Sequence, residues 1–165
     1  MSFNWVSSEP NGRSGGLLFG FNSDTVDIIS HNCGKFLISS IISHKEKNFS
    51  WKFLNVYGAA QEVNKRDFLC ELASFCHNSS VPLLIGGDFN IIRRESDKNK
   101  PGGTNKWSFL FNAIIEQHGL IELDLVGRQY TWSNNRLDPT FEKLDRFLVS
   151  PEWDLAYRNV IPLMS

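Results

Sequence analysis

The amino-acid sequence predicts a single domain of the α/β (α+β) class that extends over residues 1–165. Two observations carry this prediction. The first third of the chain contains short runs rich in β-formers, and residues 49–57 begin by alternating apolar and polar side chains, as a strand with one buried face does. Further along, two segments have apolar residues at helical spacing, and a short apolar run lies between them. A chain of this length can bury one hydrophobic core.

The first third is predicted to be an antiparallel meander. A cluster of Ser, Gly, Pro and Asn makes residues 1–16 a predicted loop, although Trp5 and Val6 lie within it. Polar residues 44–48 separate two β-rich runs and predict a hairpin loop. The strands expected here cover residues 17–21, 26–29, 36–42 and 49–57.

The rest of the chain is predicted to mix helices with further strands. Residues 62–77 carry a helical apolar stripe that ends at Asn78. A second helix is expected after Thr104, its cap, with Gly119 just beyond its end. Pro151 suits the first turn of a last helix. The other β-prone segments are residues 120–126 (a strand or an extended link), 130–134 and 143–150.

Composition and charge exclude several classes of protein. The net charge is −1, so a phosphate-bearing partner would need a local basic patch. The three cysteines, Cys33, Cys70 and Cys76, form no C-x-x-C pair, which argues against a disulfide framework or a zinc site and favours reduced thiols in the core. We find no apolar run long enough to span a membrane and no signal peptide, and we therefore expect a reducing compartment.

The most informative stretch is V-P-L-L-I-G-G-D-F-N at residues 81–90, in which a buried strand runs through two glycines into Asp88 and Asn90. Continued strand geometry would place these two polar side chains on one face and Phe89 on the other. A carboxylate beside an amide suits a metal-bound or polarised water near a phosphate, whereas the alternative is an Asp/Asn turn that caps the next element. The charged segment 93–103 similarly predicts either a solvated loop or a contact with a phosphate backbone.

Several motifs occur in an order that resembles the endonuclease/exonuclease/phosphatase superfamily. The resemblance is strongest to the endonuclease domain of plant non-LTR (LINE-type) retrotransposons, and it covers nearly the whole chain. The motifs are S-G-G-L-L-F at 14–19, N-V-Y-G at 55–58, an Arg-led helix at 66–72, G-G-D-F-N at 86–90, Y-T-W-S-N at 130–134 and K-L-D-R-F-L-V-S-P-E-W at 143–153.

The resemblance implies a four-layer sandwich, in which two mixed, mainly antiparallel sheets pack face to face with helices outside. It also implies hydrolysis of DNA phosphodiester bonds with Mg²⁺ or Mn²⁺. By the resemblance, Asp88 orients or deprotonates the attacking water and Asn90 contacts the scissile phosphate. Tyr57 donates its hydroxyl to the phosphate oxygens as charge builds up. The resemblance also implies that Asp145 is the acid that orients a catalytic histidine.

Three further residues are expected near the substrate. Thr131 and Trp132 match the segment beside the family's site and are expected to support it. Arg146 is expected either near a DNA backbone or on the surface. The resemblance also implies DNA as the partner, a nuclear or cytoplasmic location and no membrane association.

The chain departs from the family pattern at two points. The family has an Asn and a metal-binding Glu near the N-terminus, whereas Glu9 here precedes Pro10 in a predicted loop. The family also has an S-D-H motif near the C-terminus, whereas no Asp-His pair occurs here. We therefore expect a domain incomplete at its N- and C-terminal strands, with weak or lost metal and DNA binding and impaired catalysis. The alternatives are an active endonuclease, a non-catalytic nucleic-acid-binding remnant, or another branch such as an inositol-phosphate or RNA phosphodiesterase.

Overall fold

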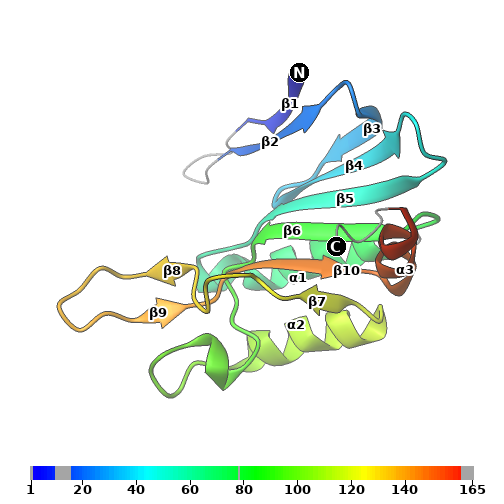
Figure 1. The fold of residues 1–165 in the computed structure, drawn as a ribbon. Helices are drawn as coiled ribbons and strands as arrows, with labels where there is room; N and C mark the ends of the chain where they lie inside the picture. Colours follow the sequence, from blue (N-terminus) through cyan, green and yellow to red (C-terminus); the bar gives the residue numbers. More distant parts are fainter. Residues whose placement is uncertain (1, 10–15, 78, 161–165) are drawn as a thin grey trace.

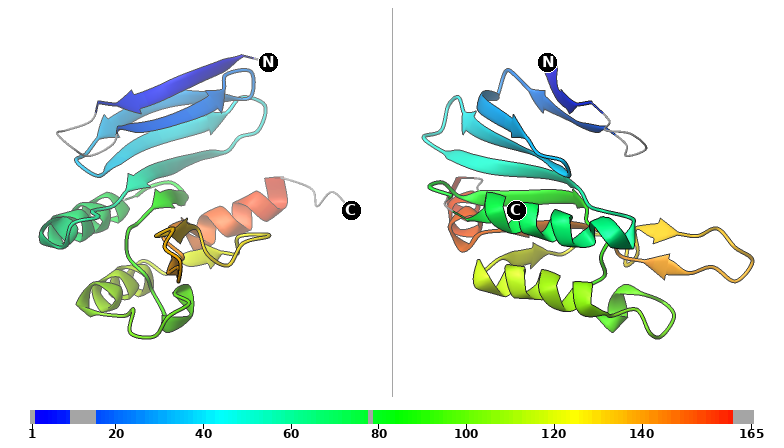
Figure 2. Two further views of the ribbon diagram at one scale, coloured as in Figure 1. Left: turned by 90° about the vertical axis from the view of Figure 1, so that its left-hand side faces the viewer. Right: turned by 180° about the vertical axis from the view of Figure 1, so that it is seen from behind.

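The computed structural model consists of a six-stranded mixed sheet, two helices on one of its faces, and a hairpin and a third helix on the other (Figure 1 and Figure 2). It describes residues 2–9, 16–77 and 79–160. In chain order the elements are β1 (Phe3–Ser8), β2 (Leu17–Asn22), β3 (Val26–Cys33), β4 (Leu37–His44), β5 (Ser50–Tyr57), η1 (Glu62–Asn64), α1 (Lys65–Cys76), β6 (Leu83–Asp88), η2 (Glu95–Asp97), α2 (Lys106–Gln117), β7 (Ile121–Leu123), β8 (Trp132–Ser133), β9 (Phe141–Glu142), β10 (Asp145–Val149) and α3 (Pro151–Val160).

The large sheet has the strand order β3-β4-β5-β6-β10-β7. Strands β3, β4 and β5 pair antiparallel, which confirms the predicted meander for residues 26–57. Strand β2, which was expected in the same meander, pairs with β1 in a separate sheet instead. Strand β6 then pairs parallel to β5, because α1 carries the chain back between them. Strand β10 pairs antiparallel to both β6 and β7. The N-terminal and C-terminal parts of the chain therefore meet in one sheet, at the pairing of β6 with β10.

Helices α1 and α2 cover one face of this sheet and form the main core with it (Figure 2). Alternate residues of the central strands point toward them, which is why Leu54, Ile85 and Leu148 are fully buried. From the helices, Phe68 and Phe111 fill the space between sheet and helix and are also fully buried. Burial of such apolar side chains contributes roughly 1.5–3 kcal/mol each.

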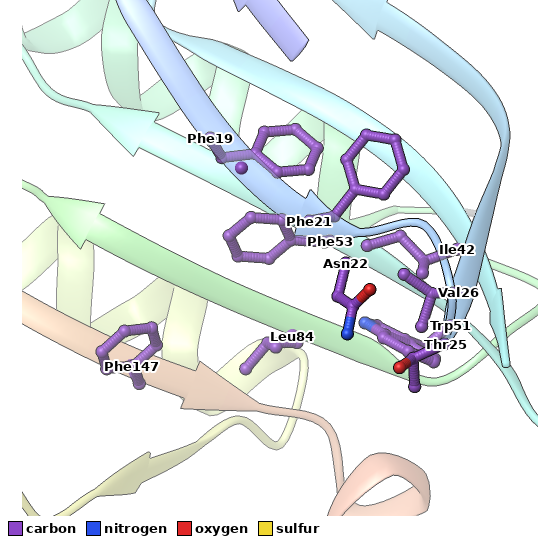
Figure 3. A pocket seen from close by; sticks show the side chains of 11 residues that line it. Phe19, Phe21, Asn22, Thr25, Val26, Ile42, Trp51, Phe53, Leu84 and Phe147 are labelled. Atoms are coloured by element: carbon purple, nitrogen blue, oxygen red, sulfur yellow. The ribbon is translucent and has the colours of Figure 1, made fainter. Parts of the chain in front are cut away.

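The hairpin of β1 and β2 lies over the opposite face, where Phe19 contacts Phe53 edge-on at a centroid distance of 5.3 Å. An apolar cavity of about 370 Å³ separates the hairpin from the sheet (Figure 3). Aromatic side chains of the hairpin and of the sheet line it, among them Phe21, Trp51 and Phe147. The predicted mixed α/β fold is confirmed. Among the described residues, the sheet that lies over the large one is this two-stranded hairpin, and β8 and β9 form a further two-stranded sheet.

Two local predictions are wrong. Residues 1–16 were expected to be a loop, but Phe3–Ser8 form β1, which pairs with β2 from Phe3↔Asn22 to Ser8↔Leu17. The cap of α2 is Asn105 rather than Thr104, because the Asn105 Oδ1 atom accepts from the backbone N–H of Trp107 at 2.9 Å. Other boundaries hold: Gly119 follows α2 with a φ of 61°, and Pro151 begins α3.

The three cysteines differ in their exposure. All three cysteines are free, but only Cys76 is buried, so the expectation of core thiols is wrong for the exposed Cys33 and Cys70. Burial raises the pKa of the Cys76 thiol to about 12, which makes that sulfur unreactive. No helix within residues 2–9, 16–77 or 79–160 has the length and apolar character needed to cross a membrane.

Candidate functional site

Three of the predicted site residues stand side by side across three neighbouring strands. Tyr57, the last residue of β5, pairs with Asp88, the last residue of β6, and Asp88 pairs with Asp145, the first residue of β10. Directly paired residues project to the same face of a sheet. These three side chains are called the Tyr57–Asp88–Asp145 row below. The row lies on the face of the sheet away from α1 and α2, because Asp145 and Phe147 share one face and Phe147 lines the apolar cavity on that face.

The two glycines of G-G-D-F-N allow β6 to fit into this row. Gly87 has a φ of 138°, and a Cβ atom added to it would lie 2.0 Å from the carbonyl oxygen of Val56. A side chain at Gly86 would lie 2.5 Å from the ring of Phe147, which crosses over it. Only glycine permits both the backbone angle and the close approach of the neighbouring strands.

Strand β6 ends at Asp88, and the chain turns instead of continuing as a strand. The Asp88 Oδ1 atom accepts from the N–H of Asn90 at 2.8 Å, and Asn90 has a φ of 51°. Phe89 is fully buried and packs against Phe68 and Phe111. The predicted turn is therefore present, and this turn, rather than strand alternation, brings Asp88 and Asn90 together. It does not cap the next element, η2, whose N-cap is Arg94.

Four hydrogen bonds brace this turn against the loop that follows β5. The Gly58 N–H donates to the carbonyl of Asp88 at 2.6 Å, and the Asn90 side-chain amide donates to the carbonyl of Gly58 at 2.9 Å. Lys65, at the start of α1, donates from Nζ to the carbonyls of Ala59 at 2.9 Å and Asn90 at 2.5 Å. Sequence reasoning missed Lys65, because nothing in N-K-R-D-F shows that this lysine reaches two loops. Within the described part of the chain the Asn90 amide donates one hydrogen bond, so its second hydrogen is available to another partner.

Thr131 supports the other side of the row. Its Oγ1 atom accepts from the backbone N–H groups of Leu144 and Asp145, each at 3.0 Å, and so holds the start of β10. The next residue, Trp132, lies in the hairpin of β8 and β9, which projects beyond this end of the sheet (Figure 1), and it is 44% exposed. Thr131 thus acts on the backbone of Asp145, and Trp132 faces solvent beside it.

Burial and neighbouring charges set the electrostatics of Asp88. Burial is the largest influence and raises the pKa of its carboxyl group, and the nearby Asp145 carboxylate raises it further. The Asn90 N–H and the Lys65 ammonium oppose both effects. The pKa of Lys65 is itself lowered by burial. Asp88 is therefore more basic than a free aspartate, which suits a carboxylate that accepts a proton from water, and Tyr57, 40% exposed, presents a hydroxyl donor beside it.

Arg146 does not lie where the sequence suggested. Its side chain is 0% exposed, so it is not a surface residue and has no access to a DNA backbone. Its guanidinium group pairs with Asp97 at 2.7 Å and with Glu122 at 3.1 Å. The parity of the strand explains this placement, because Arg146 shares the helix-facing side with Leu148.

The same network revises the prediction for residues 93–103. Asp97 is buried, and Arg93 forms a close ion pair with Glu122, so these two residues are a built part of the fold. Residues 94–96, 99 and 101–102 are exposed, as expected of a solvated loop. Burial disfavours the charged form of Glu122, but hydrogen bonds from Lys143 and Arg93 and the charge of Arg146 prevail and lower its pKa to about 2. The network anchors the segment 93–103, which follows β6, to strand β10. It lies on the helix-facing side of the sheet, behind the candidate site.

The described residues contain no cluster of side chains that fits a metal ion. A hard cation such as Mg²⁺ needs several oxygen ligands in near-octahedral geometry. In the part of the chain that the structure describes, no group of three or more His, Cys, Asp or Glu side chains could hold an ion. The histidines also lie away from the row; His118, for example, lines a cavity with Leu83 at the opposite end of β6.

Comparison with known proteins agrees with the fold and the motifs. A profile of the endonuclease/exonuclease/phosphatase family matches residues 2–163, and the chain therefore belongs to this family. No curated protein matches the sequence.

Solved structures share the fold at low sequence identity. The endonuclease domain of TRAS1, a telomere-specific non-LTR retrotransposon, superposes with a TM-score of 0.68 at 12% identity, over 90% of this chain and 67% of that one. A family protein from Bacteroides thetaiotaomicron has a TM-score of 0.60 at 13% identity, over 90% and 61%. The human Nocturnin catalytic domain gives 0.60 at 14% identity, also over 90% and 61%. The chain thus spans about two thirds of the length of these structures.

Proposed function

We propose that this chain is an endonuclease-like domain of the non-LTR retrotransposon type, which binds DNA at the Tyr57–Asp88–Asp145 row and is impaired in phosphodiester hydrolysis. The observation that carries this proposal is the pairing of these three side chains across β5, β6 and β10. The motif K-L-D-R-F-L-V-S-P-E-W favours the retrotransposon branch over another branch such as an inositol-phosphate or RNA phosphodiesterase.

Each member of the row has a distinct role in the proposal. Asp88 orients the attacking water and accepts its proton, for which its raised pKa is suited. Tyr57 donates its hydroxyl to a phosphate oxygen, and the remaining amide hydrogen of Asn90 donates to another. Asp145, held by Thr131, is the carboxylate that would orient a histidine.

The impairment follows from the side chains available. No histidine of the described chain lies in the row, so Asp145 has no imidazole to orient, and the carboxylates around the row are too few for a magnesium site. Removing a single group that stabilises transition-state charge typically lowers the rate by about 10²–10³-fold. We therefore expect this chain to retain DNA binding although its hydrolysis of phosphodiester bonds is impaired.

The DNA contact is proposed for the hairpin of β8 and β9. Trp132 is 44% exposed beside the row, and an exposed indole offers a stacking surface to a base. Its neighbour Thr131 fixes the start of the hairpin to the backbone of Asp145, which connects the hairpin to the row.

The test combines plasmid nicking with DNA binding. Nicking of supercoiled plasmid is measured with Mg²⁺, with Mn²⁺ and with a chelator, for the wild type, for Asp88→Asn and for a matched surface control, Asp27→Asn. We expect the wild type to nick no faster than Asp88→Asn. Metal-dependent nicking that Asp88→Asn abolishes and Asp27→Asn preserves would overturn the impairment.

Binding is followed by fluorescence anisotropy of labelled DNA at several salt concentrations. We expect salt-dependent binding that Trp132→Ala weakens by about 1–3 kcal/mol. The control is Trp5→Ala, an exposed tryptophan on the β1–β2 hairpin. The absence of any binding at low salt would overturn the assignment to DNA.

A further inference from the structure

We propose that Lys65 is a positioning residue for the candidate site: it ties the Asp88–Asn90 turn to the loop after β5 and places a positive charge beside the Asp88 carboxylate. This inference rests on the proposed function for the role of Asp88, but its evidence is the local geometry. Lys65 begins α1, far from β6 in sequence, and its Nζ atom is bound by the carbonyl oxygens of Ala59 and Asn90 at 2.9 and 2.5 Å.

The two carbonyls belong to the two loops that flank the site. Ala59 lies two residues after Tyr57, and Asn90 lies two residues after Asp88. Between them, Gly58 donates to the Asp88 carbonyl and accepts from the Asn90 side chain. Lys65 therefore closes a ring of hydrogen bonds that holds the ends of β5 and β6 in one arrangement. Hydrogen bonds from a charged donor are among the stronger ones in proteins.

The same ammonium group acts on Asp88 through space. The groups that face Asp88 are the Asn90 N–H of its own turn, Asp145 from β10, Lys65 from α1 and Tyr57 from β5. The Asn90 N–H and Lys65 favour the ionised carboxylate, and Lys65 is the one cation among these groups. Lys65 is in turn influenced by Glu62 and Glu142, which favour its charged form. The position of Lys65 thus offsets part of the penalty that burial and Asp145 impose on the Asp88 charge.

The experiment compares three substitutions of Lys65. Lys65→Met removes both the charge and the hydrogen bonds, Lys65→Gln removes the charge but keeps a donor, and Lys65→Arg keeps both. The control is Lys45→Met, which removes an exposed lysine paired with Asp27 at the other end of the strands. The readouts are the pKa of the Asp88 carboxyl, followed by ¹³C NMR titration, and the hydrogen exchange rate of the Gly58 amide.

We expect the pKa of Asp88 to rise in Lys65→Met and in Lys65→Gln and to return to the wild-type value in Lys65→Arg. The Gly58 amide should exchange at least about tenfold faster in Lys65→Met, since two charge-assisted hydrogen bonds are lost. A brace without electrostatic influence would change the exchange rate and leave the Asp88 pKa unmoved. If Lys65→Met does not fold, the pair Lys65→Gln and Lys65→Arg still separates the charge from the brace.

An Asp88 pKa that is the same in Lys65→Gln and in the wild type, or that moves equally in Lys45→Met, would overturn the inference. Neither readout requires DNA, a metal ion or activity. Failure of the proposed DNA function would therefore leave this result standing, and failure of this inference would leave DNA binding untouched.

Discussion

Replacing Arg146 by Met should strongly destabilise the fold, because the substitution leaves the buried Asp97 carboxylate without its cation. Arg146 is fully buried, and its guanidinium group donates to the Asp97 carboxylate at 2.7 Å and to the Lys143 carbonyl at 2.6 Å. Asp97 is only 9% exposed, and Arg146 is the one cation paired with it among the ion pairs of the described residues. Glu122, by contrast, would keep Lys143 and Arg93.

The magnitude follows from this difference between the two acids. Breaking a buried pair by removing one partner typically destabilises a protein by about 3–5 kcal/mol. Two backbone N–H groups, of Arg93 and Arg94, still donate to Asp97, and the Arg146 Nε atom has no partner to lose. We therefore expect the lower part of that range, about 3 kcal/mol, which is a large share of the 5–15 kcal/mol typical of a domain.

The assay is urea unfolding followed by tryptophan fluorescence, with the m-value required to stay constant. Arg128→Met, on an exposed arginine, serves as the control and should change the free energy of unfolding by no more than about 0.5 kcal/mol. The double variant Arg146→Met with Asp97→Asn should be more stable than Arg146→Met alone, because it removes the stranded charge. A loss below about 1 kcal/mol in Arg146→Met, or no recovery in the double variant, would refute this account of the network.

Three other perturbations test the same structure. Gly87→Ala should destabilise the fold by about 3 kcal/mol or more, because the added Cβ atom would meet a backbone oxygen. Gly102→Ala, also at positive φ but in open space, should lower the free energy of unfolding by only about 1 kcal/mol. Equal decreases for the two variants in urea unfolding would contradict the packing argument. The folded-state pKa of Glu122 is about 2, below its ordinary value of 4.5, so the contribution of its ionised form to the free energy of unfolding is present above pH 4.5 and is lost as the pH falls toward 2. The free energy of unfolding of the wild type should fall by on the order of 2–3 kcal/mol over that pH range, and Glu122→Gln should lack this decrease. Thr131→Val should lower the free energy of unfolding by about 2 kcal/mol and shift the NMR signals of Asp145, because two hydrogen bonds to the Thr131 hydroxyl are lost. Thr131→Ser should preserve the stability and the signals. Unshifted signals in Thr131→Val would show that the hydroxyl does not hold β10.

Local patterns predicted most elements because they report on one segment at a time. The alternation in residues 49–57 and the helical stripe of residues 62–77 each depend only on which side of that segment is buried. The same logic failed for β1, since turn-forming residues follow Trp5 and Val6 closely and mask a short strand. That strand exists because β2 offers it a partner along its whole length.

The candidate site was predicted unevenly for the same reason. Tyr57, Asp88 and Asp145 were identified from the motifs around them, but their adjacency is a matter of register between strands. Arg146 looked like a surface or DNA-facing residue, because a cation next to an acid in K-L-D-R gives no sign of burial. Lys65 had no signal at all, since both of its partners are backbone carbonyls in other loops.

By itself, the sequence determined the class of fold and the family, and it identified the stretch in which two glycines precede Asp88 without deciding between a strand and a turn there. Only the tertiary structure decided which charges are buried, which acids stand beside Tyr57, and that Lys65 and Thr131 hold the two ends of the row. The physical reason is range: helices, strands and turns follow from neighbours within a few residues, whereas the burial of Arg146 and the bracing of Asp88 depend on segments that meet only when the sheet assembles.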